Sequence, residues 1–192
     1  MAKFARPPSD RNRLGFSTGV AMHFDQNEDA ALYLFPVEAG IGLTLGDRYD
    51  LGISVGNFLG TAEGNFALID GNLRLGILHG IGLGMIASQA EQAVLTQLTA
   101  GTFLQTGRRH AFFMGLKYTY GTSVGSDAFV PTGYFTGSIG FLPSGVVKVT
   151  PELSINHARW TQPGDPDDIQ NRAWTVVIGV TVMTHYGRAR TY

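Results

Sequence analysis

Six ionisable side chains fall inside the strand-like stretches of the sequence, where charge is otherwise rare: Glu38, Asp70, Arg74, Lys117, Lys148 and Glu152. Side-chain alternation places them on the row opposite the apolar residues of each stretch. Three acids and three bases in a narrow interior favour a salt-bridge network that plugs it, because an unpaired buried charge is costly. The other interpretation is a selectivity ring in a pore. We expect Glu38, Arg74, Lys117 and Glu152 to lie at a similar depth.

No other residues of the chain form a recognisable catalytic or metal-binding motif. The histidines show no H-E-x-x-H spacing, and the absence of cysteine removes thiolate ligands. The carboxylates of "DPDD" (Asp165, Asp167 and Asp168) have the chemistry of a loop Ca²⁺ site, although a solvated loop is the simpler interpretation. Phosphate-binding glycine loops and nucleophile elbows are absent from the sequence. We therefore predict no catalytic residue, no metal centre and no cofactor.

The elements that position these residues are β-strands. Apolar residues alternate with small or polar ones in ten stretches, at about 13–24, 31–45, 50–59, 65–78, 81–88, 93–105, 110–122, 132–142, 145–160 and 172–186. Most stretches exceed the roughly 5–6 residues of an ordinary strand. They are long enough for a tilted strand to cross a bilayer, which takes about 9–11 residues.

The rows opposite the apolar ones indicate which face meets water. They are rich in Gly, Ser and Thr, whereas a water-facing row would carry many charges. Only 15% of the chain is charged, against roughly 25% in soluble domains, and glycine occurs 26 times. Small residues suit the interior of a narrow barrel, which leaves the apolar rows facing lipid. In the alternative fold, a soluble lipocalin-like carrier, the apolar rows would point inward.

The connections between stretches alternate in length and charge. Tight turns are predicted around 46–50, Gly80, 106–109 and 143–145, and longer loops around 25–30, 60–64, 88–92, 123–131 and 161–171. The longer set contains acids, Glu63 among them, and no Lys or Arg, while Arg residues gather on the short-turn side, where we also place Asp50. We expect a periplasmic segment at 1–12, one barrel domain at 13–192 and short acidic extracellular loops. We also expect that a signal peptide lies outside this numbering, because residues 1–13 lack an apolar core.

With these features the chain resembles bacterial outer-membrane β-barrel proteins over nearly its whole length. The resemblance implies an all-β, closed antiparallel up-and-down transmembrane barrel of ten strands, alternatively eight, in a Gram-negative outer membrane. It implies outer-membrane lipid or lipopolysaccharide as partner, with other envelope proteins as further candidates, and leaves the oligomeric state open. A net charge of −1 gives no basic field for nucleic acid.

The run "SINHARWTQPGDPDD" at 154–168 resembles the last hairpin of outer-membrane lipid A 3-O-deacylases. In that family a His-x-Ser-Asn run supplies a base and a nucleophile. His157 matches the histidine, but Arg159 and Trp160 stand where the serine and asparagine would be, so no hydroxyl is available for activation. We expect His157, Arg159, Trp160 and Trp174 to contact lipid headgroups at the outer rim without hydrolysis.

Several functions remain open, because small barrels serve many roles. The favoured one is a structural or interaction protein with acidic extracellular loops and a charge-plugged lumen. The alternatives are a narrow channel for small solutes, a lipid A-modifying enzyme or an inactive relative of one, and the soluble carrier.

Overall fold

The protein is an all-β chain in the computed structural model, which describes residues 12–25, 30–45, 48–56, 59–87, 92–106, 111–124, 132–142, 147–161 and 170–186. The strands are β1 (Asn12–Asp25), β2 (Ala30–Leu45), β3 (Tyr49–Val55), β4 (Leu59–Ile69), β5 (Leu73–Ala87), β6 (Gln92–Thr106), β7 (Ala111–Val124), β8 (Thr132–Leu142), β9 (Val147–Thr161) and β10 (Gln170–Tyr186). Within these residues, no helix is long and apolar enough to cross a membrane.

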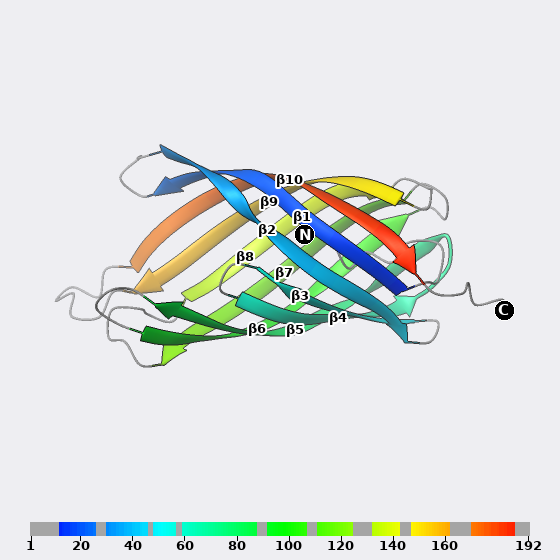
Figure 1. Cartoon of the computed structure of the whole chain (residues 1–192), viewed down its shortest axis with the longest axis horizontal. Helices are drawn as coiled ribbons and strands as arrows, with labels where there is room; N and C mark the ends of the chain where they lie inside the picture. The colour runs from blue at the N-terminus through cyan, green and yellow to red at the C-terminus, as the bar shows by residue number, and fades with distance from the viewer. Residues whose placement is uncertain are drawn as a thin grey trace.

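The ten strands form one closed antiparallel barrel (Figure 1). Each strand pairs with its neighbours in sequence, and β1 pairs with β10 to close the wall. The apolar rows face outward, so that Ile178 keeps 67% of its surface exposed, while the alternate rows are buried, as Thr119 is at 1%. The structure confirms the predicted ten-stranded up-and-down barrel and contradicts the soluble carrier, whose apolar rows would point inward.

The strand boundaries between β3 and β5 differ from the sequence prediction. β4 contains residues 60–64, which were predicted as a loop, and β5 continues through Gly80, which was predicted as a turn. The chain turns instead at residues 70–72, "DGN", between β4 and β5. An Asp-Gly pair is a strong hairpin signal, but the unbroken alternation on both sides of it masked the turn.

A bulge changes which residues of β2 face outward. The β1–β2 register passes from Ser17 paired with Glu38 to Gly19 paired with Phe35, so β2 carries one extra residue. Leu32 on one side of the bulge and Ile41 on the other are both exposed, although one position is even and the other odd. Strict alternation from Ile41 predicts that Tyr33, Phe35 and Val37 also belong to the outward row, and these three side chains lie outside the described residues.

Candidate lumenal site

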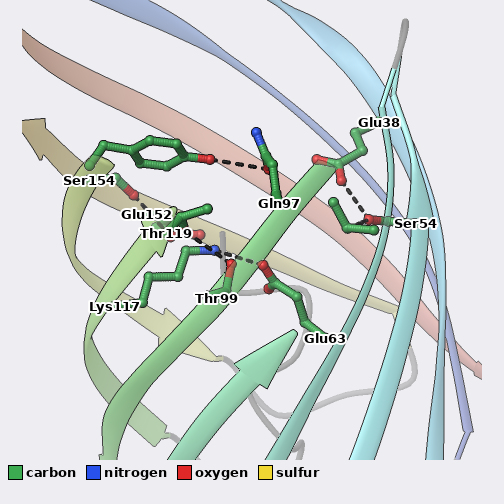
Figure 2. Close-up of polar contacts among 11 residues, drawn as sticks. Glu38, Ser54, Glu63, Gln97, Thr99, Lys117, Thr119, Glu152 and Ser154 are labelled. Carbon is green, nitrogen blue, oxygen red and sulfur yellow. Dashed lines mark hydrogen bonds and ion pairs between the residues drawn. The ribbon is translucent and has the colours of Figure 1, made fainter. Parts of the chain in front are cut away.

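A salt bridge joins β7 and β4, which are separated by two strands of the wall, near the middle of the lumen. Lys117 of β7 donates through Nζ to Glu63 Oε1 of β4 at 2.9 Å, and Figure 2 shows the two side chains reaching toward each other. A Cβ on Gly80 would lie 2.7 Å from Glu63 Cγ, and one on Gly101 would lie 2.8 Å from Lys117 Cβ. These two glycines therefore make the room that the ion pair occupies. The Lys117 and Glu63 side chains remain 22% and 20% exposed, so water reaches them.

A second carboxylate, Glu38 of β2, is held at the end of the β3–β4 hairpin. Ser54 Oγ donates to Glu38 Oε1 at 2.6 Å, and the Ser54 and Thr61 hydroxyl oxygens are 2.7 Å apart. A Cβ on Gly56 would lie 3.6 Å from Glu38 Cγ, which places the Glu38 side chain against the hairpin end. Further bonds complete the network (Figure 2): Tyr134 to Gln97 at 3.3 Å, Thr99 with Thr119 at 3.0 Å, and Ser154 to Glu152 at 3.0 Å.

A separate cluster around Arg74 lies near the short turns. Arg74 Nε donates to Asp70 Oδ1 at 2.8 Å, and its Nη2 lies 3.9 Å from Asp50 Oδ2. The guanidinium carbon is 5.7 Å from the centre of the Phe103 ring, within the range of a cation–π contact. Arg74 is the second residue of β5 because the chain turns at 70–72. The expectation that it lies at mid-strand, level with Lys117, is therefore wrong.

The set of charged side chains in the interior differs from the set predicted from the sequence. Asp50 and Glu63, which the sequence placed on the two rims, both point into the lumen, and Asp70 lies in a turn rather than within a strand. Among the described side chains, four lumenal carboxylates (Glu38, Asp50, Glu63 and Glu152) and Asp70 at the short-turn rim accompany two cations, Arg74 and Lys117. The Lys148 side chain is outside the described residues. Recognising "DGN" as a turn would have placed Glu63 on a strand.

The outer wall near the long loops carries a histidine packed on a tryptophan. His157 of β9 and Trp174 of β10 are paired in register, and their ring centres are 4.3 Å apart. Ser154, by contrast, is buried in the lumen. The side chains of Arg159 and Trp160, like Asp165, Asp167 and Asp168, lie outside the described residues, so their roles stay predictions. No group of three or more metal-ligating side chains occurs in the part of the chain that the structure describes.

The wall as a whole defines the class of the protein. A closed sheet leaves no free edge around most of its circumference, and its outer face is apolar while its inner face is polar and small. An even-stranded, single-chain barrel of this kind is a transmembrane barrel of the outer-membrane type. The chain is thus an integral β-barrel protein of the bacterial outer membrane.

Several solved structures are similar to the chain at low sequence identity. Neisserial surface protein A is 9% identical, with 91% of this chain and 97% of that chain covered and a TM-score of 0.44. The outer membrane protein OprG from Pseudomonas aeruginosa is 10% identical, with coverages of 94% and 100% and a TM-score of 0.39. Ail, the attachment invasion locus protein of Yersinia pestis, is 10% identical, with coverages of 89% and 99% and a TM-score of 0.31. No protein-family model and no curated protein matches the sequence.

Proposed function

We propose that the protein has a structural or interaction role in the outer membrane and does not conduct solutes, because its lumen is closed near the short turns. The observation that carries the proposal is the burial of Arg74 and Asp50. The Asp50 side chain has no exposed surface and Arg74 keeps 7%, whereas Glu63 and Lys117 keep about a fifth. Water therefore reaches the middle of the lumen, and Asp70 at the short-turn rim, but hardly reaches Arg74 and Asp50 between them.

Other buried side chains in the short-turn half of the lumen support a seal rather than a gate for ions. Asn65, Gln105, Thr150 and Met183 face the same half of the lumen and are all nearly fully buried. A permeating ion keeps or replaces its water shell, and side chains that water barely reaches support a half of the lumen that is closed to a hydrated ion. The guanidinium also holds two carboxylates, so opening a path would expose several charges at once.

A planar-bilayer recording tests the proposal. We expect no steady conductance from the wild-type barrel, because the short-turn half is filled. Arg74→Ala should produce conductance, because it removes the central group of the seal. Glu38→Gln should not, because Glu38 lies in the part of the lumen that water already reaches. Large, steady conductance of the wild type would contradict the seal and favour a channel.

The surface available for interaction is the long-loop rim. We propose that the His157–Trp174 pair, with a half-exposed indole, contacts lipopolysaccharide headgroups there, because amphipathic rings favour the membrane interface. The acidic loops adjoin this rim in the sequence and lie outside the described residues, so their display toward other envelope proteins remains part of the proposal.

A further inference from the structure

On the long-loop side, the β3–β4 hairpin ends before the neighbouring strands β2 and β5 do, so the barrel wall is lower there. β2 pairs with β1 from Ala30 onward, but its described pairing with β3 begins only at Ala39. β5 pairs with β6 as far as Ala87, but with β4 only as far as Gly84. Among the described pairings, residues 30–38 and 85–87 thus have a strand on one side only. Figure 1 shows the short hairpin between longer strands. With ordinary strand rise and tilt, the end of the hairpin lies on the order of 10–15 Å below the ends of β2 and β5.

Apolar side chains border these open edges on the outer face. Leu32, Val55 and Met85, from β2, β3 and β5, are 69%, 62% and 60% exposed. Such residues indicate that the edges lie at the depth of lipid rather than above it. Backbone N–H and C=O groups at that depth are satisfied either by protein or by a water-filled cavity. The open edges therefore pair with a partner strand or face water in the lumen.

Two features of β2 argue against a partner strand. Pro36 lies within the open edge and has no N–H to offer. The bulge opposite Ser17 and Gly19 interrupts the regular spacing of the same stretch. Prolines and bulges are the devices by which natural edge strands avoid pairing. The edge of β2 is thus built to remain free, which leaves water as its partner.

Polar groups lie directly inside the end of the hairpin. Glu38 precedes the first β2 residue that pairs with β3, and it is partly exposed beside Ser54 and Thr61. Ser17, its register partner on β1, is 2% exposed, and its hydroxyl has no hydrogen-bond partner within the described structure. The water-accessible Glu63–Lys117 pair lies further in. Two accessible carboxylates and one ammonium give this region a net negative charge.

We infer that the barrel is open sideways between β2 and β5, above the β3–β4 hairpin, and that the opening admits the ammonium head of a membrane amphiphile to Glu38 and the Glu63–Lys117 pair. The apolar body of the amphiphile stays in the membrane against Leu32, Val55 and Met85. The net negative charge inside favours a cationic head over an anionic one. This inference does not depend on the seal at Arg74, which lies at the other end of the lumen.

Spin-labelled lipid tests the opening without any substitution. The wild-type barrel is placed in nanodiscs containing phosphatidylcholine with a doxyl group on the acyl chain, and threonine methyl signals are followed by NMR. We expect loss of the Thr61 signal, because Thr61 lies inside the hairpin end. The matched control is Thr136, which is buried in the lumen on β8, where both neighbouring strands are paired, and its signal should be retained. Retention of both signals would show that lipid does not reach Thr61 and would overturn the inference.

Titration with dodecyltrimethylammonium tests the class of ligand. Tetramethylammonium serves as the head alone and dodecyl maltoside as the uncharged amphiphile. We expect saturable shifts at Ser54 and Thr61 with the cationic amphiphile only. Glu38→Gln should weaken binding about tenfold, as loss of a charge-assisted contact does, while Asp70→Asn, which removes the same charge from the short-turn rim, should not. Equal binding of dodecyl maltoside, or of tetramethylammonium, would overturn the assignment of a cationic amphiphile.

Discussion

Lys117 and Glu63 are 54 positions apart in the sequence and form a 2.9 Å salt bridge across the lumen. They belong to β7 and β4, which are separated in the sheet by β5 and β6, so the curvature of the wall over these four strands brings them together. The bridge ties β7 to β4 at a level that water reaches. It is therefore both a structural contact and a charged group of the interior that water can reach.

Removing the ammonium should destabilise the barrel. Lys117→Met removes the cation paired with Glu63 from a lumen that also holds the Glu38 and Glu152 carboxylates, and we expect a loss of roughly 1–3 kcal/mol in the free energy of unfolding. Urea unfolding in detergent micelles measures it. The double variant Lys117→Met/Glu63→Gln should recover part of the loss, because it leaves no unpaired charge at the site. Strictly additive effects of the two substitutions would contradict a direct interaction.

Glycine at position 80 should be required for the same bridge. In Gly80→Ala the new Cβ would lie 2.7 Å from Glu63 Cγ and 3.0 Å from the Ala62 carbonyl oxygen. We expect a destabilisation of about 1–3 kcal/mol, the usual cost of overpacking. Gly137→Ala is the matched control, because a Cβ there meets nothing within 4 Å. Thermal unfolding followed by gel mobility compares the two, and equal midpoints would show that Gly80 has no such role.

Period-two alternation predicted the closed barrel and the facing of most rows, because a pleated strand turns successive side chains to opposite sides. It failed where that period is broken. The bulge in β2 shifted the facing of Leu32, and an unrecognised turn at 70–72 moved Glu63 from a predicted loop into the lumen. Alternation also cannot identify partners across a barrel. The pairing of Lys117 with Glu63 depends on the registers of β4 with β5, β5 with β6 and β6 with β7, which no local pattern contains.

Arginine on the outer face should be costly. Ile178 is the midpoint of an exposed apolar row of β10, so Ile178→Arg should destabilise the barrel by about 2–4 kcal/mol if it lies near the middle of the bilayer. Folding equilibria in lipid vesicles provide the measurement, with Ile178→Leu as the apolar control. A barrel that tolerates the arginine as well as the leucine would not have this face in lipid.

His157 should bind without catalysing acyl transfer. A deacylase needs a base, a nucleophile and an oxyanion stabiliser within reach of one another. The imidazole of His157 lies against Trp174 on the outer wall, and the nearby hydroxyl of Ser154 is buried on the other side of the same strand, where it donates to Glu152. No serine hydroxyl of β9 can therefore be activated by this imidazole.

We expect no acyl-chain release when the purified protein is incubated with lipid A and the products are followed by mass spectrometry. His157→Ala should weaken retention of lipopolysaccharide while leaving the barrel folded, because it removes half of the aromatic pair, and Ser154→Ala should leave retention unchanged. Acyl release that disappears in His157→Ala would identify the protein as an enzyme and contradict a purely binding role for this wall.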